Sequence, residues 1–142
     1  MLRTFGALVV VVVAASAVGA QAAPQPSVRV MFRTPSGNIG CAGSVAMKGL
    51  PSILRCDILS GLRPPPRGSC ELDWTGYSFQ GRGRASPTCA GDTVYDARAP
   101  VLRYGKTWKQ GPFTCTSRRT GLRCTNATGH GFVLPRARSH RF

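Results

Sequence analysis

The sequence has almost no helical periodicity. Its apolar runs are short and alternate with polar residues, at residues 28–33, 53–58, 77–79 and 101–104, which is typical of half-buried strands. Clusters of Gly, Pro, Asn and Asp separate these runs and indicate tight turns. We therefore predict an all-β fold, a small sandwich or barrel of short antiparallel strands.

Acidic residues are scarce. Five Asp and Glu stand against 19 Lys and Arg, so the formal net charge is +14 at pH 7. Such a charge attracts polyanions at long range and attracts them less as salt rises. Anionic envelope polymers, lipid head groups and nucleic acid are the partners it allows, although no motif favours nucleic acid. The arginines are also scattered along the chain. A GC-rich genome encodes many arginines at surface positions without a functional role, so the charge has a second explanation in composition.

Leu, Ile and Phe are sparse, whereas Gly and Pro number 17 and 11. A chain of this length forms one domain and buries only about two-thirds of its unfolded surface. We expect a single monomeric domain whose core alone is thin. Cross-links would then be needed for stability, since one disulfide that closes about 15 residues adds roughly 3 kcal/mol.

The chain has one sustained apolar run, at residues 8–20. It is shorter than the roughly 20 residues that span a bilayer, which argues against a membrane anchor. Arg3 precedes it, and Ala20, Gln21 and Ala22 offer the small-x-small pattern of a signal peptidase site. We expect a signal peptide at residues 1–22, cleaved after Ala22, and a single secreted domain at residues 23–142.

Six cysteines lie beyond this segment. An even number in an exported chain indicates a disulfide framework, because thiols outside the cytosol are not kept reduced. No two cysteines stand at C-x-x-C spacing, which disfavours a metal site, and nothing indicates a cofactor. We therefore expect a small disulfide-stapled domain.

Spacing alone does not decide the disulfide pairing, but a short sequence pattern that occurs twice in the chain, an internal echo, helps. Residues 37–41 and 111–115 each end in a cysteine, and a Leu-Arg-Cys triplet follows each of them. Both patterns are typical of hairpins clamped by two cysteines on one face. We favour pairing of neighbours: Cys41 with Cys56, Cys70 with Cys89, and Cys115 with Cys124.

Four motifs suggest a family. They are F-x-x-P-S-G-N-I-G-C at residues 32–41, C-x-G-D-T at 89–93, Y-G-x-x-W at 104–108 and G-H-G-F at 129–132. In these motifs the chain resembles small secreted actinobacterial proteins grouped as a domain of unknown function. The resemblance implies secretion and a bacterial source, and it transfers no catalytic residues.

One alternative function is a small secreted hydrolase such as a ribonuclease. Such an enzyme needs a general base and a general acid, and the candidates are Glu71 or Asp73 with His130. Glycines flank His130 on both sides and would let a ligand approach closely, but the same pattern serves a simple turn. No G-x-S-x-G elbow is present, so an enzyme is the less favoured interpretation.

A second alternative is an extracellular protease inhibitor or a protein-binding module. Residues 63–69 form a proline-rich segment directly before Cys70. A stiff loop anchored by a disulfide is organised in advance for insertion into a partner. Arg67, which precedes Gly68, is the residue that a trypsin-like protease would recognise.

The densest positive patch is the C-terminal tail, residues 135–142. It contains Arg136, Arg138 and Arg141, which we predict to be binding residues. The favoured function is that of a secreted basic, non-enzymatic module that associates with anionic cell-envelope material through this charge.

Overall fold

The computed structural model describes residues 27–46 and 51–142, and all regular elements in this part are strands. The signal peptide expected at residues 1–22 lies outside the described residues. The first sheet contains β1 (Ser27–Arg33), β2 (Ile39–Ala46), β3 (Ile53–Ile58), β4 (Asp73–Gln80) and β5 (Ser86–Ala90). The second contains β6 (Thr107–Gln110), β7 (Phe113–Arg118), β8 (Gly121–Thr125), β9 (Gly131–Leu134) and β10 (His140–Arg141).

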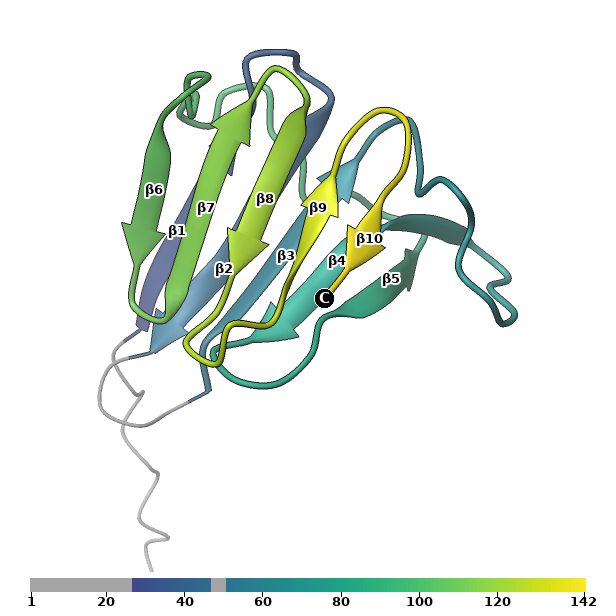
Figure 1. The fold of residues 1–142 in the computed structure, drawn as a ribbon, viewed down its shortest axis with the longest axis horizontal. Helices are drawn as coiled ribbons and strands as arrows, with labels where there is room; N and C mark the ends of the chain where they lie inside the picture. Colours follow the sequence, from purple (N-terminus) through teal and green to yellow (C-terminus); the bar gives the residue numbers. More distant parts are fainter. Residues whose placement is uncertain (1–26, 47–50) are drawn as a thin grey trace, which may run out of the picture.

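The two sheets stack face to face as a β-sandwich (Figure 1). Each is an antiparallel meander in chain order, with β1 and β5 at the edges of one and β10 and β6 at the edges of the other. Because both sheets keep open edges, the fold is a sandwich and not a barrel. The prediction of an all-β fold is confirmed.

Aromatic side chains from both sheets fill the core between them. The ring of Phe79 on β4 lies 5.1 Å from that of Phe113 on β7 and 5.0 Å from that of Phe132 on β9. Phe113 and Phe132 are fully buried. Alternate residues of a strand point to opposite faces, so these strands bury one face and leave the other to solvent or loops.

Three disulfides staple the sandwich, and they join the neighbouring cysteines that the sequence favoured. Two clamp directly opposed strand residues, Cys41 with Cys56 and Cys115 with Cys124, with Cα atoms 4.1 Å apart in each pair. The third joins Cys70 to Cys89. Three disulfides suggest an oxidising environment outside the cell. Within the described ranges, no helix has the length and apolar character needed to cross a membrane.

The connection from β5 to β6 crosses the outer face of the first sheet. It is closely fitted there, because a Cβ on Gly40 of β2 would lie 2.7 Å from the Cα of Tyr95. Beyond β1 the connection forms one bridge, between Arg33 and Val101, and the amide of Leu102 donates to the carbonyl of Arg33 (2.8 Å). The strand predicted at residues 101–104 is therefore reduced to a single bridge.

The C-terminal segment is part of the folded body. The amide of Ser139 donates to the carbonyl of Arg63 (2.7 Å), and Phe142 exchanges two backbone hydrogen bonds with Gly131. These contacts place β10 beside β9 at the edge of the second sheet. The arginines of this segment are therefore carried on an ordered surface.

Candidate functional site

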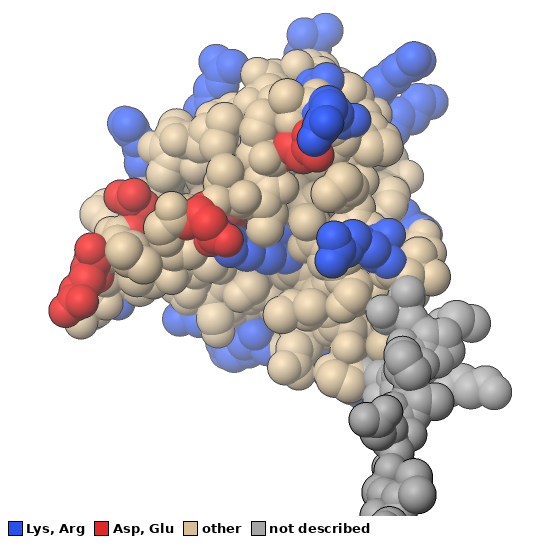
Figure 2. Space-filling model, turned by 180° about the vertical axis from the view of Figure 1, so that it is seen from behind, with Lys and Arg blue, Asp and Glu red and all other residues tan. Residues whose placement is uncertain are grey.

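Charge is unevenly distributed over the surface. Figure 2, which views the molecule from behind, shows lysines and arginines around most of the outline and most of the acidic residues toward one side. In the part of the chain that the structure describes, Arg55 and Arg98 are the only basic residues that form ion pairs. The other described lysines and arginines have no carboxylate within ion-pair distance.

Three arginines line a small cavity at one end of the sandwich. Arg118 and Arg119 belong to the β7–β8 hairpin, and Arg136 follows β9. Figure 1 shows that this hairpin, the β1–β2 connection and the segment after β9 all reach the same end of the molecule. The cavity has a volume of ≈ 30 Å³, and we call it the arginine pocket.

Gly121 brings two segments of the arginine pocket together. Its φ angle is +144°, and a Cβ at this position would lie 2.6 Å from the carbonyl oxygen of Leu134 and 2.7 Å from the Cα of Pro135. Only glycine permits this backbone conformation and this close an approach. The chain after β9 therefore passes directly over the β7–β8 turn, which places Arg136 beside Arg118 and Arg119.

Tyr104 supports one arginine of the pocket. The guanidinium of Arg119 lies over its ring, 5.3 Å from the centroid, an attractive cation–π arrangement. The turn that carries Tyr104 is fixed to β7, because Gly105 donates to the carbonyl of Ser117 (2.7 Å) and Ser117 donates to the carbonyl of Lys106 (3.0 Å). The ring of Tyr104 is therefore fixed in position, and it orients the guanidinium of Arg119.

The β1–β2 turn forms a polar wall of the same pocket. Thr34 is buried, and its amide donates to the carbonyl of Ile39 (2.9 Å). The Nδ2 of Asn38 donates to the Oγ of Ser60 (3.2 Å), and the amide of Asn38 donates to the Oγ of Ser36 (3.3 Å). These hydrogen bonds hold the β1–β2 turn in shape and tie it to Ser60 of the β3–β4 loop, and the charged donors that line the pocket are those of the arginines.

A second, larger hollow lies against the first sheet. It has a volume of ≈ 570 Å³, and its lining includes Trp74 and three acidic residues, Asp57, Asp73 and Asp92. We call it the acidic hollow.

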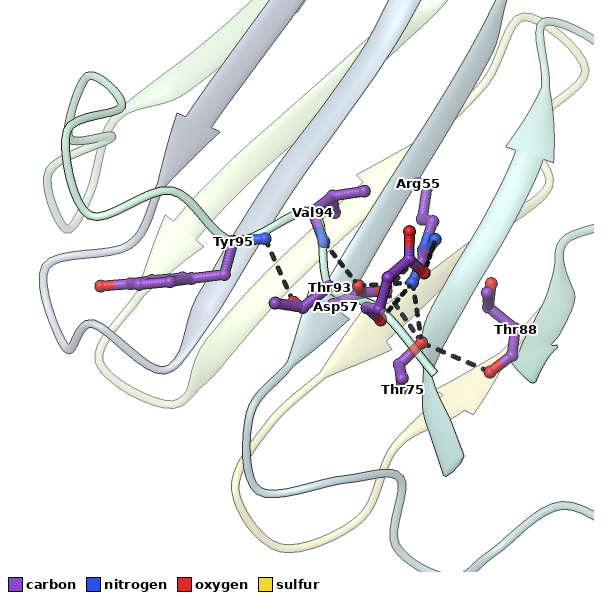
Figure 3. Close-up of polar contacts among 8 residues, drawn as sticks. Arg55, Asp57, Thr75, Thr88, Thr93, Val94 and Tyr95 are labelled. Carbon is purple, nitrogen blue, oxygen red and sulfur yellow. Dashed lines mark hydrogen bonds and ion pairs between the residues drawn. The ribbon is translucent and has the colours of Figure 1, made fainter. Parts of the chain in front are cut away.

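The innermost carboxylate of the acidic hollow is fully used by the fold (Figure 3). Asp57 is 1% exposed and accepts two hydrogen bonds of 2.9 Å from the Nε and Nη2 of Arg55. The hydroxyl of Thr75 (3.1 Å) and the amide of Val94 (2.9 Å) also donate to it. Asp57 therefore fastens the β5–β6 connection to β3 and β4.

Arg55 extends this network outward. Its Nη1 donates to Oδ1 of Asp92 (3.0 Å), and its Nη2 donates to the carbonyl of Asp92 (2.9 Å). Burial alone would lower the pKa of Arg55, but the hydrogen bonds and charges of Asp57 and Asp92 outweigh it and raise that pKa. The cation therefore stays charged, and the whole cluster is a structural clamp.

The structure does not bring the candidate acid and base residues together. Asp73 begins β4 at the acidic hollow, with Glu71 two residues earlier in the exposed loop. His130 lies at the other end of β4, because its carbonyl accepts from Asn126 (2.9 Å), whose Nδ2 donates to the carbonyl of Gln80 (3.0 Å). A strand of this length spans about 20 Å, too far for joint acid and base catalysis.

The other sequence candidates lie on separate surfaces. Arg67 is exposed in the β3–β4 loop, and Arg138 is exposed after β9. The Nη1 of Arg141 donates to the carbonyl of Ala85 (2.8 Å), so this guanidinium partly links the two sheets. Of the three C-terminal arginines, only Arg136 lines the arginine pocket.

Sequence reasoning missed Arg118 and Arg119 as parts of a site. The only signal was the Arg-Arg-Thr-Gly turn between the last two cysteines, and nothing in it indicates that Arg136 lies alongside.

Comparison with known proteins places the chain in a family without giving it an activity. No curated protein and no solved structure matches it. A family model described as a family of unknown function (DUF6636) matches residues 7–142, which confirms the resemblance seen in the sequence motifs. The chain belongs to the DUF6636 family.

Proposed function

We propose that the protein is a secreted, non-enzymatic module that associates with anionic cell-envelope material. The observation that carries the proposal is the unpaired positive charge: within the described residues, only Arg55 and Arg98 have carboxylate partners. Unpaired surface arginines raise the local concentration of polyanions and gain affinity by releasing their counterions.

Export is part of this proposal. Three disulfides fit an oxidising compartment, and residues 1–22 carry the features of a signal peptide cleaved after Ala22. The mature domain would then begin at residue 23 and lose only one basic residue, Arg3. Mass spectrometry of the protein recovered from the producing culture would check both the start of the chain and the three disulfides.

The C-terminal segment should contribute to envelope binding without acting as a loose tether. Arg136 and Arg138 are exposed, whereas Ser139 and Phe142 hold the end of the chain to the body. Truncation would therefore damage the second sheet, and point substitutions are the appropriate test.

The experiment is sedimentation of the purified, disulfide-intact protein with envelopes of the producing bacterium. We expect the protein to pellet at low salt and to leave the pellet as salt rises, because mobile ions screen exposed charges. The variant R136Q/R138Q should leave it at lower salt than the wild type. Wild-type protein that stays in the supernatant at low salt would contradict the proposal.

A further inference from the structure

We propose that the arginine pocket is a binding site for a single phosphate group. The proposal deepens the proposed function, on which it rests for its biological setting, by naming the chemical group of the envelope anion that makes a specific contact. It concerns Arg118, Arg119 and Arg136, and it separates them from arginines that supply only long-range attraction.

The charge of the pocket matches a phosphate. None of its three guanidinium groups forms an ion pair with a carboxylate in the described part of the chain. Each guanidinium offers a planar fork of donors that fits phosphate oxygens two at a time. One such fork suffices for a carboxylate, whereas three forks match the oxygens and the higher charge of a phosphate.

The size of the pocket limits what can enter. A volume of ≈ 30 Å³ holds roughly two water molecules. This is room for the head of a tetrahedral anion, but not for a sugar ring or a base. The rest of the ligand must therefore remain outside. The pocket then recognises the phosphate group and not the molecule that carries it.

The pocket is organised before any ligand binds. Tyr104 lies under Arg119, and Gly121 holds the segment of Arg136 against the hairpin. In the wall, the hydroxyl of Thr34 donates to the carbonyl of Ile39 and the Nδ2 of Asn38 donates to Ser60 of the β3–β4 loop. The backbone that carries the three arginines is therefore already in place, and the remaining ordering on binding is that of the exposed side chains of Arg118 and Arg136.

The surface offers a matched control for these three arginines. Arg29 is exposed on β1, and Arg82 and Arg84 line a shallow cavity of ≈ 300 Å³ beside β4. None of the three lines the arginine pocket. The variant R29Q/R82Q/R84Q therefore removes the same charge as R118Q/R119Q/R136Q but leaves the pocket intact.

The test is titration with inorganic phosphate at constant ionic strength, followed by NMR of the backbone amides and the arginine Nε–H groups. We expect saturable shifts at residues 118–121 and at Arg136. The pocket variant should bind at least about tenfold more weakly, because it loses charged hydrogen bonds, and the control variant should bind as the wild type does. Equal weakening in both variants, or shifts spread over all arginines, would overturn the proposal.

Both variants must first show the same unfolding transition as the wild type. Should the triple pocket variant not fold, R136Q alone, compared with R82Q alone, provides the same contrast. Weaker phosphate binding by R136Q than by R82Q supports the site, and equal binding by the two refutes it.

Two further probes distinguish the sources of the phosphate, and a third tests whether the pocket prefers phosphate to carboxylate. Vesicles of phosphatidylcholine with phosphatidic acid present it on a lipid, a glycerol phosphate polymer presents it on a chain, and polyglutamate presents carboxylates at similar charge density. A probe that requires the pocket should bind the control variant but not the pocket variant. Polyglutamate should bind both variants equally, and a pocket-dependent preference for it would refute the choice of phosphate.

The two proposals can fail separately. Pocket-specific binding of inorganic phosphate without sedimentation on envelopes would reject the proposed function and keep the phosphate site. Sedimentation that weakens equally in the pocket and control variants, without pocket-specific phosphate binding, would keep the proposed function and reject the site.

Discussion

The arginine pocket and the acidic hollow are opposite in the way they use charge. In the hollow, Asp57 is buried and both of its oxygens accept hydrogen bonds from Arg55 and other donors. In the pocket, three arginines share a cavity in which none has a carboxylate partner among the described residues. The carboxylate of Asp57 is thus engaged by hydrogen bonds within the fold, whereas the arginines of the pocket are available to a ligand.

This difference shows that cavity size is a poor guide to the site. The hollow is the larger of the two, at ≈ 570 Å³ against ≈ 30 Å³. Its central groups Arg55, Asp57 and Asp92, however, are already paired with one another and fasten the β5–β6 connection. A ligand there would compete with the fold, whereas a phosphate in the pocket would supply the charge that the fold lacks.

Removing Asp57 should give the largest effect. Asp57→Ala leaves the partly buried Arg55 and the amide of Val94 without their main acceptor. Breaking a buried ion pair on one side costs about 3 kcal/mol or more, so we expect a loss of this size in the free energy of unfolding. Denaturant unfolding with the disulfides intact measures it.

The same variant tests the separation of the two regions. Phosphate affinity of the folded Asp57→Ala protein should equal that of the wild type. A tenfold loss of affinity would show that the two regions are coupled.

Altering Gly121 should have an intermediate effect that reaches the pocket. Gly121→Ala adds a Cβ against the backbone of Leu134 and Pro135 at φ +144°, which should cost about 2 kcal/mol of stability and displace Arg136. Thermal unfolding and phosphate titration measure the two consequences. Gly83→Ala is the control, since φ is +85° there but nothing lies within 4 Å of the added Cβ, and it should lower stability alone. Unchanged phosphate affinity in Gly121→Ala would argue against the role of this glycine.

Removing the outer charge of the clamp should have the smallest effect. The side chain of Asp92 is 77% exposed, and its backbone carbonyl keeps a hydrogen bond to Arg55 in any variant. Asp92→Asn should therefore cost no more than about 0.5 kcal/mol, and less at high salt, as is usual for exposed ion pairs. Unfolding curves at low and high salt decide this. A cost as large as that of Asp57→Ala would mean that the clamp is centred on Asp92.

Local patterns in the sequence predicted much of the sandwich. The alternation at residues 53–58 coincides with β3, and the echo between Cys41 and Cys115 marks two hairpins that the structure contains. Both signals depend on neighbouring strands of a meander, where the pairing residues are close in sequence. This is the range over which strand alternation and turn residues carry information.

Contacts between distant segments were not predictable in this way. Val94 reaches Asp57 across 37 positions, and Arg136 lines the same cavity as Arg118 where Gly121 lets the chain after β9 approach closely. The alternating pattern at residues 101–104 indicated a strand, but the chain there meets only the end of β1. The C-terminal arginines suggested a tail, whereas the backbone bonds of Phe142 return that segment to the sheet.

The placement of the disulfides has a mechanical consequence. Two join neighbouring strands of one sheet and the third joins the β3–β4 loop to β5 of the first sheet, so none bridges the two layers. The connection between β5 and β6 is the only covalent link from one layer to the other. Tension applied between β1 and β10 would peel the layers apart while the loops closed by the disulfides kept their length. Because the cross-linked loops persist when the two layers separate, this arrangement limits how far the chain can be stretched.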